Sequence, residues 1–179
     1  MNPADSADVE LELLIKLFFD DAKQLGQFEE VTAKQVTEPS RSLLAHDHHM
    51  TVMVEKHHGT SVDVKVLETR TDDQHYSRKI LLTRQSDQAV VQYGIVRLNM
   101  GVLSPEVSEE ILKQETPLGR ILINHNVLRV VKLLSLLKIK AESELACAFG
   151  LEAGQIVYGR TALIYCDGAP AIELLEIVA

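Results

Sequence analysis

The chain has 179 residues, of which 46% are apolar and 25% are charged, and this is the composition of a globular protein that can bury a sizeable core. Its formal net charge of −8 argues against a surface for nucleic acid or for an anionic membrane, because both require a basic face. The charge does not exclude an anionic small molecule, which a few local arginines could bind.

The sequence is expected to be one cytoplasmic domain spanning residues 1–179, with residues 1–36 forming an N-terminal helix and loop. Its two cysteines, Cys147 and Cys166, are too few for a disulfide framework and suggest a reducing compartment. Residues 1–10 are acidic and do not resemble a signal peptide. Basic residues interrupt the most apolar stretch, residues 127–139, so no membrane span is expected. We expect a monomer or a small homo-oligomer.

The first expected elements are helical. Asp5 or Ser6 can cap a helix that runs to about Leu25 and stops at Gly26, because its apolar residues recur at helical spacing. Residues 28–38 are interpreted as a loop. A short helix then begins at Pro39 and Ser40 and continues to residue 44.

Five of the seven histidines fall between residues 46 and 58. His46 and His49 could supply two ligands to a metal, but no cysteine or second acidic cluster completes a site. Solvated histidines at the end of a helix are the better interpretation, and no metal or cofactor is expected. Thr51 can cap a helical turn that ends at Gly59, and Met50 is expected just before it, at the edge of the core.

Residues 61–69, 75–83 and 89–98 are predicted to be strands of one antiparallel system, because polar and apolar residues alternate. In the second strand, Tyr76, Arg78, Ile80 and Leu82 share one face. Arg78 therefore interrupts an apolar row. A guanidinium in such a place needs a bidentate acidic partner, which could come from the protein or from the carboxylate of a ligand.

Two helix starts follow. Ser104 and Pro105 begin a helix that runs to about Gln114. Thr116 and Pro117 are predicted to be the N-cap and first residue of the next helix. The backbone N–H groups of Leu118 and Gly119 would then face out of the helix start, where the dipole favours an anion. Gly119 would also let a ligand approach without a Cβ in the way.

The C-terminal third is expected to contain the final strands. Residues 128–140 suit either a helix or a long strand, and a short helix follows from Glu142 or Ser143 to Gly150. Residues 157–178 form two β-branched runs on either side of Asp167-Gly168, which predicts a hairpin. The order of these elements predicts an α+β domain in which helices cover an antiparallel sheet.

Alternation in the last strand places Glu176 on an otherwise apolar face. A carboxylate is costly to bury alone, so it is expected to be paired or functional. If paired residues of the hairpin sum to 336, through a three-residue loop with a bulge, Arg160 lies opposite Glu176; a slip of one residue would separate them. An exposed ion pair on a core hairpin is the simpler alternative.

Several motifs resemble the chorismate lyase (chorismate pyruvate-lyase) family. They are H-M-T at 49–51, Y-S-R-K-I-L-L at 76–82, T-P-L-G-R at 116–120, Y-G-R-T-A-L-I at 158–164 and D-G-A-P-A-I-E-L-L-E at 167–176. The resemblance extends from about Leu43 to the C-terminus. It implies an antiparallel sheet of about six strands, with helical flaps over an internal ligand cavity. It also implies conversion of chorismate to 4-hydroxybenzoate and pyruvate, a step of quinone biosynthesis, without metal or cofactor.

The resemblance also implies roles for individual residues. Arg78 and Glu176 would be catalytic, Arg78 by binding a carboxylate and Glu176 by contacting the ring oxygen, with Glu173 as the alternate. The expected substrate-binding residues are Met50, Arg78, Leu118, Gly119, Arg160 and Glu176. Arg160 would be a second cation for the substrate or the partner of Glu176. The ligand would be a small aromatic or dicarboxylate molecule.

Two features set the chain apart from the well-known lyases: Lys79, where glutamate is frequent, and the histidine-rich segment before Met50. The chain also resembles UTRA-type effector-binding domains of bacterial repressors, which share F-x-L-x-x-G-x-x-V at 149–157. That resemblance implies a non-catalytic domain that binds or senses an aromatic acid. The segment before Thr37 looks too short and too weakly basic for their DNA-binding winged helix, so no nucleic-acid partner is expected. The presence of both Arg78 and Glu176 favours the enzyme.

Overall fold

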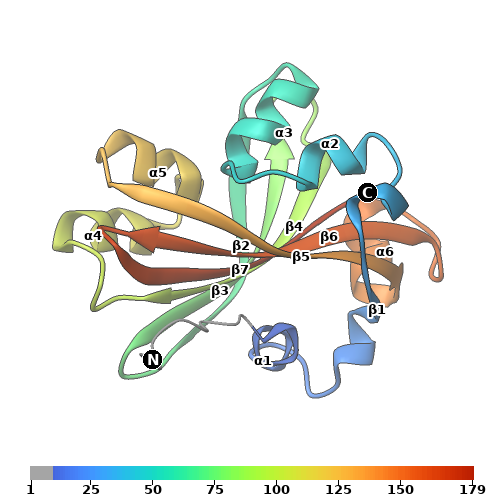
Figure 1. The fold of residues 1–179 in the computed structure, drawn as a ribbon, viewed down its shortest axis with the longest axis horizontal. Coiled ribbons are helices and arrows are strands. Elements are labelled where there is room, and N and C mark those ends of the chain that lie inside the picture. The colour runs from blue at the N-terminus through green and yellow to red at the C-terminus, as the bar shows by residue number, and fades with distance from the viewer. Residues whose placement is uncertain (1–9) are drawn as a thin grey trace.

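A computed structural model describes residues 10–179 and confirms the predicted α+β class. The strands form one antiparallel sheet of seven, in the order β1-β5-β6-β7-β4-β3-β2, and helices lie on both of its faces (Figure 1). The helices are α1 (Leu11–Lys16), α2 (Ser40–Leu44), α3 (Met50–His58), α4 (Pro105–Lys113), α5 (Leu118–Asn124) and α6 (Ser143–Phe149). The strands are β1 (Gly26–Val31), β2 (Val62–Thr71), β3 (His75–Arg84), β4 (Val90–Asn99), β5 (Arg129–Ala141), β6 (Ile156–Cys166) and β7 (Ala169–Val178).

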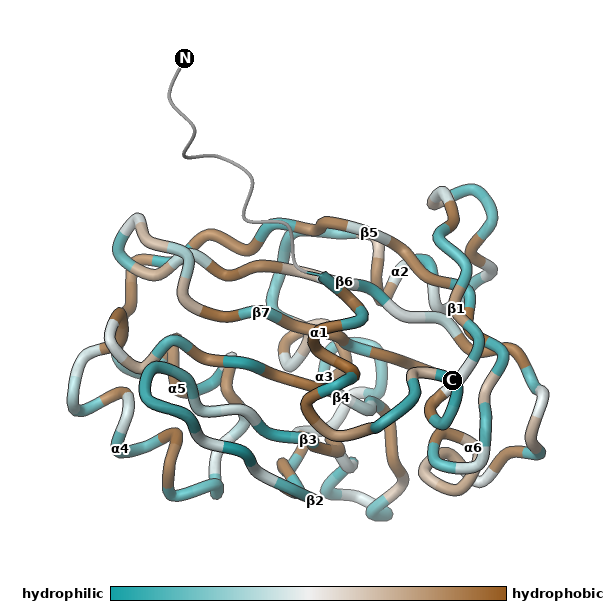
Figure 2. Tube along the Cα trace, turned by 90° about the horizontal axis from the view of Figure 1, so that it is seen from below, coloured by the Kyte–Doolittle hydropathy of each residue, from teal (hydrophilic) through white to brown (hydrophobic). Residues whose placement is uncertain are grey.

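The sheet separates two apolar cores. Helices α2, α3, α4 and α5 pack on one face, over a core that includes Ile80, Val96 and Leu174. Helices α1 and α6 pack on the other, over Tyr93 and Leu175. Figure 2 views the molecule from the side of α1, which lies across the central strands β7 and β4. Alternation along each strand sends neighbouring side chains to different cores, as the sequence predicts.

The N-terminal region differs from the prediction. The expected caps Asp5 and Ser6 lie outside the described residues, and α1 ends at Lys16 rather than near Leu25. The Asp21 side chain accepts a hydrogen bond from the Lys23 N–H and begins a separate 3₁₀ turn, so it competes with continuation of the helix. The predicted loop at 28–38 contains most of β1, which pairs with residues 136–141 of β5 and adds a seventh strand.

The structure resolves the ambiguous segment 128–140 as strand β5, which pairs with β6 along its length and with β1 at its C-terminal end. Most other predicted elements are confirmed. Ser104 caps α4, its Oγ accepting from the Val107 N–H at 3.4 Å. Helix α5 begins one residue later than expected, with Pro117 rather than Thr116 at the N-cap. Among the described residues, no helix is long and apolar enough to cross a membrane.

The hairpin of β6 and β7 has the first of the two registers considered, with Arg160 opposite Glu176. The connection differs in detail. Asp167 and Gly168 form a two-residue turn with positive φ values of 51° and 85°, and the bulge lies further along, between the Ile164 and Tyr165 pairs. Such a turn matches the twist of the strands. Before the bulge, the residue numbers of paired residues sum to 335; from the Ile164 pair to the Tyr158 pair they sum to 336, and this places Arg160 opposite Glu176.

Candidate ligand-binding site

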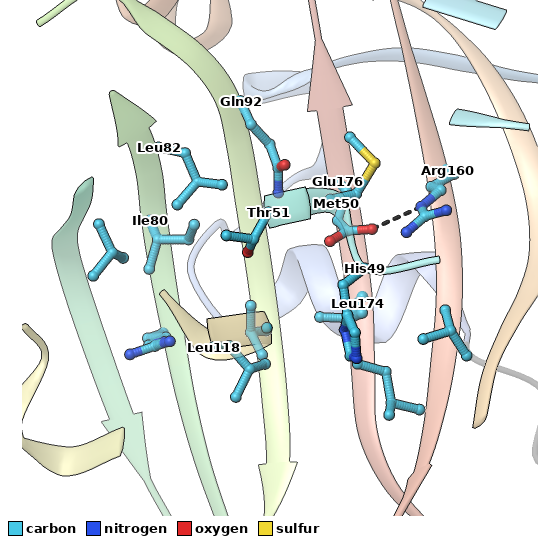
Figure 3. Close-up of a pocket in the computed structure, with 16 residues that line it drawn as sticks. His49, Met50, Thr51, Ile80, Leu82, Gln92, Leu118, Arg160, Leu174 and Glu176 are labelled. Atoms are coloured by element: carbon cyan, nitrogen blue, oxygen red, sulfur yellow. Dashed lines mark hydrogen bonds and ion pairs between the residues drawn. The ribbon is translucent and has the colours of Figure 1, made fainter. Parts of the chain in front are cut away.

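A cavity lies between the sheet and the N-terminal ends of α3 and α5 (Figure 3). Its polar lining residues are His49, Thr51, Arg78, Gln92, Arg160 and Glu176. Its wall is otherwise mainly apolar, with Val64, Ile80, Leu82, Val96, Ile164 and Leu174 among the residues that form it. The free volume is about 40 Å³, which is well below the roughly 150 Å³ of a cavity that holds benzene. The free space in the cavity is therefore smaller than one aromatic ring.

Strand pairing places the two predicted charged residues in adjacent rows of the sheet. Arg78 on β3 lies opposite Val96, which lies opposite Leu174 on β7. The next row runs from Ile80 through Gly94 to Glu176 and then to Arg160 on β6. Arg78 and Glu176 are thus two strands and two residues apart, roughly 12 Å between their Cα atoms for standard strand spacing. Their side chains face the same cavity from different strands.

Arg78 is a buried cation without a counterion among the described residues. Only 1% of the residue is exposed, and its Nε and Nη1 atoms have no hydrogen-bond partner. Burial lowers the pKa of its guanidinium, yet an arginine stays protonated at neutral pH. The structural ion pair that the sequence left open is absent from this part of the chain. An unpaired charge in such a place is expensive, so it calls for a partner from outside.

The neighbouring Lys79 is, by contrast, a cation that carboxylates of the protein itself neutralise. Its side chain points to the other face of the sheet, where Nζ lies 3.0 Å from Glu144 Oε1 and 3.4 Å from Glu68 Oε2. The Tyr93 hydroxyl also donates to Glu144, at 3.2 Å. Two adjacent cations thus have opposite environments: Lys79 has two carboxylates, and Arg78 has none.

Arg160 is the second fully buried arginine, and the protein satisfies it. Its Nε donates to Glu176 Oε2 at 2.7 Å. Its terminal nitrogens donate to the carbonyl oxygens of Leu44, His46 and His48, at 3.4, 2.8 and 2.9 Å. Arg160 therefore fixes the loop between α2 and α3 to the sheet. Of the two roles left open for it, partnership with Glu176 is the one that the geometry shows.

The alternate glutamate does not reach the cavity. Glu173 faces the other side of the sheet, where its Oε2 lies 3.1 Å from Arg97 Nη1. Glu176 instead lines the cavity, and 6% of the residue is exposed. Alternation along β7 separates them, because residues three apart on a strand point to opposite faces.

Met50 and Leu118 line the cavity at the first residues of α3 and α5, close to their expected places. Gly119 also lines it, but its lack of a side chain serves helix packing. A Cβ there would lie 3.0 Å from Thr51 Oγ1 and 3.2 Å from His49 Cβ, so these neighbours would have to shift by a few tenths of an ångström. The glycine thus lets α5 approach the start of α3. On the outside of this contact, Arg120 of α5 forms an ion pair with Glu55 of α3.

Two of the three histidines before α3, His46 and His49, are more buried than the sequence interpretation assumed, whereas His48 is exposed. His49 lines the cavity, and its Nε2 accepts a hydrogen bond from Arg129 Nε at 2.7 Å. Burial, together with the positive charge of Arg129, lowers its pKa to about 4, so the ring is neutral at pH 7. His46 donates from Nε2 to the Leu43 carbonyl oxygen at 2.5 Å. Burial and then Arg160 lower the pKa of His46 as well. In residues 10–179 no cluster of three or more His, Cys, Asp or Glu side chains is arranged to hold a metal.

Gln92 is a cavity residue that the sequence analysis did not identify. It lies on β4 opposite Leu82, is 3% exposed, and its Oε1 has no hydrogen-bond partner among the described residues. In Figure 3 the side chains of Gln92, Thr51 and Glu176 lie around the same part of the cavity. The sequence did carry a signal for Gln92, because it is a polar residue that alternates in phase with the inward-facing apolar residues of β4.

No protein-family model and no curated protein matches the sequence. Solved structures do match its fold. The effector domain of PhnF from Mycobacterium smegmatis has a TM-score of 0.54 at 14% identity, over 73% of this chain and 88% of that domain. The ligand-binding domain of a transcriptional regulator provisionally assigned to the GntR family, from Bordetella bronchiseptica, has a TM-score of 0.52 at 15% identity, over 66% of this chain and 85% of that one.

These similarities confirm the fold class and agree with the resemblance to effector-binding domains of bacterial regulators. They also correct the expectation of an enzyme. The structures that the chain resembles are described as the effector domain of PhnF and the ligand-binding domain of a transcriptional regulator, and neither is described as a lyase. The prediction that the chain is an enzyme of the chorismate lyase type is therefore corrected, whereas the predicted site roles of Arg78 and Glu176 stay predictions. The motifs shared with that family are explained by the fold, since the hairpin and helix starts that carry them also build the cavity.

Proposed function

We propose that this chain is a non-catalytic domain that binds a small organic acid in the cavity between the sheet and α3 and α5. The observation that carries the proposal is Arg78. Its guanidinium is fully buried beside the cavity and has two nitrogens without partners. A carboxylate is the group that matches the planar donors of arginine best, because it can accept two parallel hydrogen bonds. The similarity of fold to effector and ligand-binding domains supports the same proposal.

The rest of the cavity suits the body of such a ligand. Ile80, Val96 and Leu174 are buried apolar residues on its sheet side. They exclude water around the proposed ion pair, so the electrostatic attraction to Arg78 is screened less than at a surface. Losing a buried charge-assisted pair typically costs about 2–5 kcal/mol of binding free energy. Arg78 alone can thus account for a large share of the affinity.

Binding of a ring-sized acid requires the cavity to enlarge. The wall that can move is the contact between α3 and α5, where short helices meet at Gly119 and through the Arg120–Glu55 pair. The sheet is held by continuous strand pairing and is the rigid side. Ligand occupancy would therefore change the separation of α3 and α5, and this displacement is the signal that a sensing domain passes on.

The test is a calorimetric titration of the purified protein with benzoate. We expect Arg78→Ala to retain its fold and to weaken binding by about 30-fold to several-thousand-fold. Arg78→Lys should be nearly as weak, because an ammonium cannot reproduce the planar fork. Arg97→Ala is the matched control, since that arginine pairs with Glu173 on the opposite face and should leave binding unchanged.

Normal benzoate binding by a folded Arg78→Ala protein would refute the assignment of Arg78. Failure of the wild type to bind benzoate or other one-ring monocarboxylates would refute the proposed ligand class.

A further inference from the structure

A wide groove lies beside the cavity, between α3 and the start of β5, and has a free volume of about 930 Å³. Its apolar lining residues are Val52, Met53, Ile123, Val127, Leu128 and Val130. The side chains of Val52, Leu128 and Val130 are largely exposed there. His49 and Val131 line both the groove and the cavity. The two spaces therefore meet at these two residues.

A hydrogen bond crosses the place where the groove and the cavity meet. Arg129, the first residue of β5, donates from Nε to His49 Nε2 at 2.7 Å and from Nη1 to the Val127 carbonyl oxygen at 3.0 Å. His49 directly precedes α3, so this bond ties the start of the helix to the strand. Both acceptors are neutral at pH 7, since the pKa of His49 is lowered to about 4.

Arg129 takes part in none of the ion pairs within residues 10–179. A guanidinium binds a carboxylate more strongly than it binds a neutral acceptor, because the hydrogen bonds are charge-assisted and form in parallel. An acid in the groove would therefore compete with His49 for Arg129.

The charge of the groove favours such an acid. Its cations are Lys56 and Arg129, and its carboxylate is Asp47, whose Oδ1 accepts from the Leu133 N–H at 2.8 Å. The lining thus has one positive charge in excess, although the whole chain has a net charge of −8. A basic groove with apolar walls attracts an organic anion and offers a surface to its apolar body. This accounts for exposed apolar side chains beside a cation.

Given the proposed function, we propose that the acid enters the cavity through this groove and that the hydrogen bond between Arg129 and His49 is the gate. The carboxylate of the arriving acid replaces His49 as the acceptor of Arg129. The start of α3 is then free to move away from β5, and the acid passes Val131 on its way to Arg78. Arg129 is a positioning residue for entry, whereas Arg78 holds the acid in the final site. Entry is thereby selective for anions.

The experiment measures access to the cavity without any ligand. Val96→Cys places a thiol in the cavity wall, and mass spectrometry of peptides follows its reaction with methyl methanethiosulfonate, a small neutral reagent. The exposed thiol of Cys147 is the internal standard. In the Val96→Cys background, Arg129→Met and His49→Leu should each accelerate this reaction about tenfold or more, because each removes a hydrogen bond to a charged group. Lys132→Met is the matched control, since it removes a positive charge from an exposed residue of the same strand and should not change the rate.

The double variant Arg129→Met/His49→Leu distinguishes a gate from two separate losses of packing. Two residues that share one hydrogen bond act as a unit, so the double variant should react no faster than the faster single variant. Urea unfolding checks that each variant is folded. An unchanged rate in both single variants, or effects that multiply in the double variant, would overturn this inference and leave the proposed function standing. Failure of benzoate to bind the wild type in the calorimetric titration would instead count against the proposed function, and the labelling rates would still decide where the cavity opens.

Discussion

Two buried arginines on one sheet face should respond in opposite directions to the same substitution. Arg78 and Arg160 are 1% and 0% exposed, but Arg160 has a carboxylate and backbone carbonyls as partners, whereas Nε and Nη1 of Arg78 have none in residues 10–179. Methionine is long and apolar enough to fill either place. We expect Arg78→Met to increase the free energy of unfolding by about 1–3 kcal/mol, since it removes unsatisfied, charged donors. Arg160→Met should decrease it by about 3–5 kcal/mol, since it leaves Glu176 buried without a partner.

The assay is urea unfolding of the ligand-free proteins, followed by circular dichroism, with thermal unfolding in parallel. For a chain of this size, 1 kcal/mol corresponds to about 2–4 °C in Tm, so the two variants should shift in opposite directions and be well separated. Saturating benzoate should raise the Tm of the wild type and leave the Tm of Arg78→Met unchanged. A loss of stability in ligand-free Arg78→Met comparable with that of Arg160→Met would refute the reasoning, because it would mean that Arg78 has a partner within the protein.

Three further predictions concern the surroundings of the cavity. Gly119→Ala should destabilise the protein by about 1–3 kcal/mol, measured by urea unfolding, because its Cβ would lie 3.0 Å from Thr51 Oγ1; unchanged stability would show that α5 shifts freely. Glu173→Gln should change stability by less than about 1 kcal/mol, since its pair with Arg97 is partly exposed; a large loss would contradict this. The folded-state pKa of His49, about 4, lies below its unfolded value. The contribution of the neutral ring to the free energy of unfolding is therefore present above pH 6.5 and is lost as the pH falls towards 4. Urea titrations at pH 5 and 7 should show this loss in the wild type and less of it in His49→Gln; an equal loss in both would exclude His49 as its source.

Local patterns in the sequence were sufficient for strands β2, β3, β4, β6 and β7 and for the inward position of Arg78. The sequence left two registers open for the hairpin, and the structure has the one that places Arg160 beside Glu176. Strand β1 could not be predicted in this way, since its pairing partner is more than one hundred residues away in β5. Its own residues, Gly26–Val31, include two glutamates and have no clear period of two. Remote pairing, rather than local propensity, makes this segment a strand.

The candidate site was predictable where a charge interrupts an apolar row, and much less so elsewhere. Gln92 is neutral, so it gave a weaker signal than Arg78 although both face the cavity. The carbonyl partners of Arg160 come from the loop between α2 and α3, over one hundred residues earlier, and no sequence spacing indicates them. Gly119 was identified as a cavity residue. A glycine is needed there because α3 approaches closely, and only the assembled fold reveals that contact.

The close contact of α3 and α5 at Gly119 also has a kinetic consequence. If the chain binds a ring-sized acid as we propose, the ring exceeds the free space of about 40 Å³, and separation of these helices would precede the ion pair with Arg78. The observed association rate should then level off at high ligand concentration, at the rate of opening, instead of rising linearly. Release would wait for the same opening, so a bound acid would stay longer than its affinity for an open site implies. The domain would therefore average over short pulses of its ligand and respond to sustained exposure.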